Sequence, residues 1–379
     1  MSTPVNIGII GGGLMGKEIA SAILRWPALI DHPSRPALTA VCDINPDALD
    51  WFDQITTVTR KVTDYRELLA LDDVDVVYIA VRHDLHEEMY VAAVEAGKDV
   101  FAEKPFGIDL RAAQRIVASI DAHPDRVVRC SSEMPFFPGA QAAIDYVRAG
   151  RLGRIIEATS WFSHSSDLNI DKPINWKRQV EYCGEAGVMN DLGMHAVHVP
   201  LRLGWKPASV FSVLQNLVET RRNAEGEAVP CSTFENATLI CDVEHDDVSF
   251  PLTIATKRVD PGQKNTWGFR ALGMSGGVEF TTRYPTTLRV MTTQEDEQVW
   301  QEIEMGSQAG FPTVTGGIFE TGFSDAILQM WAAFLAERDG RLGERFGCVT
   351  PTEALDSHRI FDAALRSHQS RRAESVDAR

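Results

Sequence analysis

The first third of the chain alternates short apolar runs with segments whose apolar residues recur at helical spacing. Short apolar runs between turn signals are typical of buried strands, and repeats of three or four positions are typical of amphipathic helices. The pattern predicts strands over residues 5–10, 38–42, 74–81, 99–102 and 127–131, and helices over 17–25, 87–96 and 110–122. Strands that alternate with helices favour a parallel sheet covered on both faces, the doubly wound arrangement.

The pattern changes after Pro135 and Pro138. A predicted helix over 139–149 is followed by strand-like runs at 155–162, 209–218, 233–243, 248–256, 268–272, 277–281 and 287–291. Two further helices are predicted over 323–338 and 352–368. The polar tail, 369–379, is expected to fray. The predicted fold class is α/β. It combines an N-terminal Rossmann domain over 1–132, with a doubly wound parallel sheet, and a C-terminal α+β domain over 133–379, with a large, mostly antiparallel open sheet.

The charge balance disfavours some classes of partner. The 379 residues include 37 Lys and Arg against 53 Asp and Glu, a formal charge of −16. Such a field repels a phosphate backbone, so we expect no nucleic-acid partner. The six cysteines form no CxxC pattern, so no metal is expected, and no apolar stretch is long enough to span a bilayer. We therefore expect a protein of the reducing cytoplasm with no membrane partner.

A glycine-rich turn follows the first predicted strand. Gly11, Gly13 and Gly16 fit the G-x-G-x-x-G pattern, with Leu14 and Met15 between the last two glycines. The first glycine permits a tight turn, the second lets the backbone approach a pyrophosphate, and the third allows close packing of helix and strand. The N-terminus of the following helix adds N–H donors for the phosphates. The segment therefore predicts dinucleotide binding.

Asp43 ends the second predicted strand, where it bears on the choice of dinucleotide. A carboxylate at this position accepts hydrogen bonds from ribose hydroxyls and repels a 2′-phosphate. Ile44 follows with no adjacent arginine, which favours NAD over NADP. The alternative is that Asp43 only caps a loop.

Glu103, Lys104 and Pro105 follow the predicted strand 99–102, at the edge where open α/β sheets bind ligands. The apolar neighbours of Lys104 can partly desolvate its ammonium group, which suits a catalytic role. Spacing alone leaves a solvated surface lysine as the alternative.

A second candidate cluster surrounds Asp191 and His195. If 190–201 is helical, these two residues are four positions apart and share one face. An aspartate so placed can orient the imidazole as a general base. Zinc held with the help of His198 is a weaker alternative because the H-E-x-x-H order is absent, and an ordinary charge pair on a helix is another.

These motifs occur together and in this order, and with the stretch at 262–267 they make the chain resemble the glucose–fructose oxidoreductase/inositol dehydrogenase (Gfo/Idh/MocA) family over nearly its whole length. The resemblance implies that Lys104 contacts the reacting hydroxyl and the nicotinamide. It also implies that Asp191 and His195 bind the substrate, with His195 as acid or base, and that the protein is a homo-oligomer, a dimer or tetramer, joined through the open sheet face. By the same resemblance, the cofactor site includes Val81, Arg82, His86 and Glu103, and the substrate site includes Trp176, Lys177, Arg178 and Asn190.

Two segments depart from the family pattern. Where T-P-N-x-x-H is common, Arg82 and His83 replace Pro and Asn, and the common R-F segment is replaced by residues 132–137. Ordinary polyol specificity is therefore in doubt. Basic residues in the loops expected to line the site suggest an anionic sugar, with solvated loop charge as the alternative: Lys172, Lys177, Arg178, Lys257 and Arg258.

The predicted function is hydride transfer from a secondary ring hydroxyl of a sugar, glycoside or cyclitol to NAD. The alternative is an NAD-dependent glycosidase that oxidises its substrate transiently, eliminates the glycosidic group, adds water and re-reduces the product. A dinucleotide sensor without turnover is a third hypothesis, which Lys104, Asp191 and His195 argue against. A methyltransferase is weaker still, because these residues would have no role in it.

Overall fold

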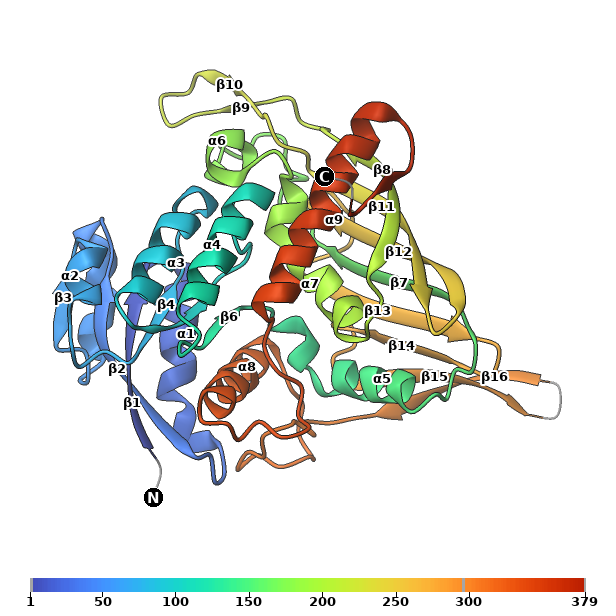
Figure 1. The fold of residues 1–379 in the computed structure, drawn as a ribbon, viewed down its shortest axis with the longest axis horizontal. Helices are drawn as coiled ribbons and strands as arrows, with labels where there is room; N and C mark the ends of the chain where they lie inside the picture. Colours follow the sequence, from blue (N-terminus) through green and yellow to red (C-terminus); the bar gives the residue numbers. More distant parts are fainter. Residues whose placement is uncertain (1–2, 295–296, 378–379) are drawn as a thin grey trace. The chain divides into compact units, whose positions relative to one another are not determined.

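The computed structural model describes residues 3–294 and 297–377 (Figure 1). The chain forms two compact units that interleave along the sequence. The first comprises residues 1–107, 111–136 and 307–354, and the second comprises 108–110, 137–306 and 355–379. This division differs from the predicted limits of 1–132 and 133–379 in that 307–354 joins the first unit. The predicted domain limits themselves stay a prediction.

The first unit contains a six-stranded parallel sheet in the order β3-β2-β1-β4-β5-β6. Its strands are β1 (Thr3–Ile10), β2 (Ser34–Cys42), β3 (Arg60–Val62), β4 (Val76–Ile79), β5 (Asp99–Ala102) and β6 (Val128–Cys130). The helices that follow them are α1 (Leu14–Leu24), α2 (Tyr65–Leu69), α3 (His86–Glu95) and α4 (Leu110–Ala122). The strand order reverses between β1 and β4, as in a doubly wound sheet, so the predicted fold class is confirmed for this unit.

A helix from late in the chain completes the first unit. Helix α8 (Phe323–Arg338) packs against α1 and against the middle of the sheet. Its Phe334 ring stacks on Phe101 of β5 at 4.7 Å, and its Trp331 ring lies 5.8 Å from Tyr78 of β4. These aromatic contacts bury one face of the sheet and explain why 307–354 belongs with residues far earlier in the sequence.

The second unit is built on a nine-stranded sheet in the order β16-β15-β14-β13-β7-β12-β11-β8-β17. Its neighbouring strands run antiparallel except β7 and β12, which are parallel, so the predicted mostly antiparallel sheet is confirmed. The strands are β7 (Ile155–Ser163), β8 (Pro207–Gln215), β11 (Asn236–His245), β12 (Val248–Lys257), β13 (Thr266–Gly273), β14 (Gly277–Thr281), β15 (Thr287–Gln294), β16 (Glu297–Glu304) and β17 (Glu374–Ser375). A separate hairpin pairs β9 (Thr220–Arg222) with β10 (Ala228–Pro230).

Helices pack on this sheet. Helix α7 (Val188–Arg202) contacts β7, β12 and β13, and α5 (Pro138–Arg148) contacts β14 and β15; α6 (Val180–Cys183) and α9 (Pro351–Ser370) complete the unit (Figure 1). The expectation that 369–379 frays is wrong for Glu374–Ser375, because these residues pair with β8 as β17. Residues 378–379 lie outside the described part. No helix among the described residues is both long and apolar enough to cross a bilayer.

Candidate active site

The glycine turn lies between β1 and α1, where the sequence places it. Gly11 has a φ of +105°, and a Cβ on it would lie 2.2 Å from the carbonyl oxygen of Ala80. A Cβ on Gly16 would lie 2.0 Å from the carbonyl oxygen of Gly11. Gly13, by contrast, is exposed at the start of α1, and a Cβ there would meet no atom within 4 Å. The turn thus needs two of its glycines for its own packing and leaves open space at the helix N-terminus, which fits a bound pyrophosphate.

Asp43 follows β2 and is tied to the glycine turn. Its Oδ2 accepts a hydrogen bond from the Gly12 N–H at 2.7 Å, and its Oδ1 accepts one from the Asn45 N–H at 2.8 Å. A pocket of about 450 Å³ lies beside it, and its wall includes the predicted cofactor residues Gly11, Asp43, Ile44 and Val81. A carboxylate held by main-chain donors at the edge of such a pocket suits the adenosine half of NAD, so the residues present fit this cofactor.

Two acidic side chains also line this pocket. Asp64 and Glu88 both bind Arg66, at 3.4 Å and 2.8 Å. Arg66, which also lines the pocket, is thus paired with two carboxylates, and Asp43 adds a third carboxylate to the pocket wall, so the wall is poorly suited to a 2′-phosphate. This arrangement agrees with the preference for NAD over NADP predicted from Asp43.

The loop that carries Lys104 is anchored by His86. The Nδ1 atom of His86 lies 2.6 Å from the carbonyl oxygen of Pro105, and its Nε2 atom lies 3.1 Å from that of Val81. The imidazole is fully buried, and burial lowers the pKa of His86. His86 therefore joins the segments that follow β4 and β5, which is a positioning role within the predicted cofactor site.

Arg82 and Glu103, two other residues of the predicted cofactor site, are both bound to side chains of the protein. Arg82 forms a two-point ion pair with Asp84, at 3.1 Å and 3.0 Å. The buried Glu103 carboxylate accepts a hydrogen bond from the Tyr78 hydroxyl. Lys104 is half-buried.

In the second unit, α7 carries both residues of the predicted catalytic pair. Asp191 and His195 are four positions apart on one helix, as expected, and both are buried. The His195 ring packs edge-on against Phe162 of β7, with centroids 5.1 Å apart, and its main-chain oxygen accepts a hydrogen bond from Trp267 Nε1 at 2.8 Å. These contacts place the imidazole above the end of β7.

The carboxylate of Asp191 binds two cations. Lys177 Nζ lies 2.7 Å from its Oδ1, and the Nε and Nη2 atoms of Arg258 lie 3.1 Å and 3.0 Å from its Oδ2. Burial lowers the pKa of Arg258, but Asp191, Cys183 and Asp167 together outweigh burial, and the net shift is upward. Lys177 is half-exposed, so it forms the accessible side of this ion-pair cluster.

His164 is a further residue of this cluster, and the sequence analysis did not single it out. It follows directly after β7, and its Nδ1 lies 2.8 Å from the Ser166 hydroxyl. Burial lowers the pKa of His164 to about 4; Asp191 opposes this shift, and Arg258 and Lys177 add to it. The only signal in the sequence is a histidine at a predicted strand end, because Asp191, Arg258 and Lys177, which act on its pKa, lie far away in the sequence.

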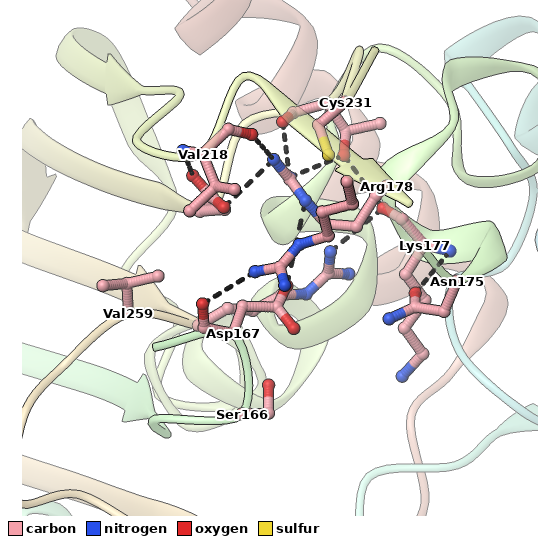
Figure 2. A network of polar contacts seen from close by, with 12 residues as sticks. Ser166, Asp167, Asn175, Lys177, Arg178, Val218, Cys231 and Val259 are labelled. Carbon is pink, nitrogen blue, oxygen red and sulfur yellow. Dashed lines mark hydrogen bonds and ion pairs between the residues drawn. The ribbon is translucent and has the colours of Figure 1, made fainter. Parts of the chain in front are cut away.

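Arg178 is directed into the interior of the unit (Figure 2). Its side chain is fully buried, its Nη1 donates to the Thr233 main-chain oxygen at 2.6 Å, and its Nη2 lies 3.1 Å from Glu235 Oε1. Asp167 lies 3.8 Å from its Nε and also binds Lys172 at 3.0 Å. This network holds the loop after β7 to the segment before β11.

The prediction of an anionic substrate therefore loses much of its basis. Of the five basic residues that suggested it, four bind carboxylates of the protein: Lys172, Lys177, Arg178 and Arg258. Arg178 and Arg258 are also buried, and a buried cation with a carboxylate partner has little left to offer an anionic ligand.

The remaining predicted substrate residues flank this cluster. Trp176 is half-buried on the short helix Trp176–Arg178, with Lys177 Nζ 5.6 Å from its ring centroid. Asn190 is fully buried, and its Nδ2 donates to the main-chain oxygens of Ile108 and Cys183, both at 2.7 Å. Across residues 3–294 and 297–377, no three His, Cys, Asp or Glu side chains are grouped so as to hold a metal ion.

Comparison with known proteins identifies relatives for both parts of the chain. The family model described as "Oxidoreductase family, NAD-binding Rossmann fold" matches residues 5–129, and the "GFO/IDH/MocA C-terminal domain" matches 140–249. Levoglucosan dehydrogenase of Pseudarthrobacter phenanthrenivorans is 27% identical over 231 residues, which cover 59% of this chain and 57% of that protein. Inositol 2-dehydrogenase/D-chiro-inositol 3-dehydrogenase of Shouchella clausii is 37% identical over 128 residues, 33% of this chain and 35% of that protein.

Solved structures match over the full length. The structure described as "Levoglucosan dehydrogenase, complex with NADH" has a TM-score of 0.87 at 21% identity, and an oxidoreductase domain protein from Kribbella flavida has a TM-score of 0.89 at 21% identity. Each match covers 100% of both chains, and at this identity the likeness is one of fold. With both family models matched in order, the chain belongs to the Gfo/Idh/MocA family of oxidoreductases.

Proposed function

We propose that this protein is an NAD-dependent dehydrogenase that oxidises a secondary ring hydroxyl of a sugar, glycoside or cyclitol. The observation that carries the proposal is the placement of Lys104 in the first unit. It follows β5 at the carboxyl edge of the sheet, the same edge at which Gly11, Asp43 and Val81 line one pocket. Ligands of doubly wound sheets bind at this edge, beside the point where the strand order reverses.

The cofactor residues divide by task. Gly11, Gly13 and Gly16, with the N-terminus of α1 and the adjoining Leu14 and Met15, would bind the pyrophosphate. Asp43 would accept hydrogen bonds from the ribose hydroxyls, with Ile44 beside it. Val81, Arg82, His86 and Glu103 would border or support the nicotinamide end. When bound, NAD supplies the hydride acceptor at its nicotinamide ring.

The substrate residues belong mainly to the second unit. His195 would take the proton of the reacting hydroxyl as general base, and the Lys104 ammonium would stabilise the oxyanion that develops. Asp191, with both oxygens bound to cations, holds Lys177 in place beside the sugar. Trp176 would offer an apolar face to the ring. Asn190 anchors the start of α7, and we leave Arg178 out of the substrate contacts because it is buried among protein partners.

The substrate class follows from these charges and from the named relatives. We propose a neutral ring, of the kind represented by levoglucosan or inositol in those relatives' names. An anionic substrate remains testable by comparing neutral and anionic forms of one glycoside. Equal kcat/KM for the two forms, or a preference for the neutral form, supports the neutral class, whereas a strong preference for the anionic form contradicts it.

A panel of sugars, cyclitols and glycosides tests the proposal, with NADH and released aglycone measured together. A dehydrogenase accumulates NADH in step with substrate consumed. Release of aglycone without net NADH would instead establish the redox-cycling glycosidase. No NADH and no aglycone with any compound, from protein that binds NAD, would contradict both.

We also propose that the protein forms a homo-oligomer through the open sheet face. Phe211 and Val213 of β8 and Ile240 of β11 are exposed, and Ile240 is the registered partner of Phe211. A contiguous apolar patch on a sheet favours a second copy as its cover. Light scattering on wild type and Ile240→Lys would check this, since the substitution is expected to shift the mass towards that of the monomer.

A further inference from the structure

Two buried carboxyl groups lie in the loops beside Lys104. Glu103 immediately precedes the lysine, and Glu133 follows β6; both are more than nine-tenths buried. Strands β5 and β6 are neighbours in the sheet, and the Ser131 N–H donates to the Ala102 oxygen at 2.8 Å. The two loops therefore run side by side at the carboxyl edge.

Residues from other elements enclose the pair. Tyr78 of β4 donates its hydroxyl hydrogen bond to Glu103, while Cys130 of β6 and Tyr90 of α3 are buried close to Glu103. Burial raises the pKa of each of these three side chains, so all three are neutral near pH 7. Lys104 supplies the positive charge of this cluster.

One lysine does not compensate two buried carboxylates. Ionising both costs desolvation twice and adds repulsion between like charges. Burial, and then the negative charge of Glu103, raise the pKa of Glu133 to about 7, although Lys104 acts in the opposite direction. Near neutral pH Glu133 is therefore partly protonated.

We propose that Glu133 is a positioning residue for Lys104: by gaining or losing its proton in the loop beside that of Glu103, it sets the charge around the lysine. The inference rests on the proposed function, because the task of Lys104 is assigned there. When Glu133 loses its proton, the surroundings of Lys104 gain one negative charge. The ionised Glu133 binds the ammonium more firmly and opposes the negative charge that develops on the substrate oxygen.

Glu133 lies in the segment 132–137, which departs from the R-F pattern of the family. It adds a titrating group next to the lysine, so the family's lysine works here in surroundings whose charge changes near neutral pH.

Competitive acetylation of the protein without cofactor or substrate tests the coupling directly. A trace of acetic anhydride labels Lys104 at each pH of a series, and peptide mass spectrometry measures the extent of labelling. The midpoint of this curve is the pH at which the lysine becomes reactive. Because Glu133 is ionised where the lysine titrates, Glu133→Gln should lower that midpoint by about one pH unit. Glu95→Gln, which removes an exposed carboxylate from α3, should leave it unchanged. An unchanged midpoint in Glu133→Gln overturns the proposal.

Wild-type protein provides a test that needs no variant to fold. Its Lys104 labelling curve should show a second inflection near pH 7, where Glu133 loses its proton, and a single-step curve overturns the proposal. Activity adds a third readout: the kcat/KM ratio of Glu133→Gln to wild type should rise several-fold from pH 6 to pH 8.5, since the glutamine cannot ionise. A purely structural role would change this ratio equally at all pH values.

Failure of the inference and failure of the proposed function are distinguishable. If wild type forms NADH from a sugar but the Lys104 labelling midpoint is the same in wild type and Glu133→Gln, the inference alone is wrong. If the midpoint shifts as expected but no compound of the panel yields NADH, the coupling stands and the proposed function is wrong.

Discussion

Arg258, the residue after β12, holds Asp191 of α7 by two nitrogen atoms on a single carboxylate oxygen, at 3.1 Å and 3.0 Å. Both side chains are almost completely removed from solvent. The contact joins the helix that carries His195 to the end of a central strand, so one ion pair both stabilises the unit and orients the predicted active-site helix.

Replacing Arg258 by Met should be costly, because it removes a buried cation that binds the buried Asp191 carboxylate through two nitrogen atoms. We expect a loss of about 3–5 kcal/mol in the free energy of unfolding, the usual result of breaking a buried pair from one side. Urea denaturation measures it. Arg270→Met, which breaks the exposed pair with Glu157, is the matched control and should cost about 0–1 kcal/mol. Equal costs for the two variants would mean that Asp191 is compensated by other means.

Replacing His195 by Ala should abolish most turnover and leave cofactor binding intact. Loss of a general base lowers kcat by about 10²- to 10⁴-fold. Steady-state NADH formation measures the first effect and a calorimetric NAD titration measures the second. His245→Ala, at the end of β11, is the control and should retain full activity. Unchanged kcat in His195→Ala would remove this residue from the mechanism.

Replacing Gly16 by Ala should disrupt the dinucleotide turn, whereas Gly13→Ala should leave the fold intact. A Cβ at position 16 would overlap the Gly11 oxygen, and a Cβ at position 13 meets no neighbour within 4 Å. We expect overpacking of about 1–3 kcal/mol for Gly16→Ala and weaker NAD binding in both variants. Thermal unfolding with and without NAD separates the two effects. Equal stability of the variants would contradict the steric argument.

Acid should destabilise the protein partly through His164. The pKa of His164 is lowered to about 4 in the folded state, so between its ordinary value of 6.5 and 4 the unfolded chain binds the proton and the folded chain does not. The contribution to stability is therefore present above pH 6.5 and is lost as the pH falls towards 4.

The asparagine in His164→Asn cannot titrate, so this variant should lose less stability than wild type between pH 7 and pH 4.5. Urea unfolding at each pH measures the loss. His245→Asn is the control and should behave like wild type. If the difference in stability between wild type and His164→Asn does not change with pH, the lowered pKa of His164 is contradicted.

Much of the fold could be read from local pattern. Strands β1, β4 and β5 and helix α4 lie where apolar periodicity predicts them, and the Gly11–Gly16 turn lies between the predicted strand and helix. These features depend on neighbours within a few positions. The short strands β9 and β10 escaped prediction because three-residue strands have too little periodicity to detect.

The sequence by itself determined the alternation of elements, the glycine turn, the carboxylate after the second strand and the helical spacing of Asp191 and His195, because each is a short-range property of the chain. Only the tertiary structure decided which charges meet. Arg258 reaches Asp191 across 67 positions, Arg178 reaches Thr233 across 55, and Glu133 lies in the loop beside that of Glu103. Strand order and packing decide which of these distant residues become partners. In this protein they pair four of the basic residues expected to bind an anion with carboxylates of the protein itself.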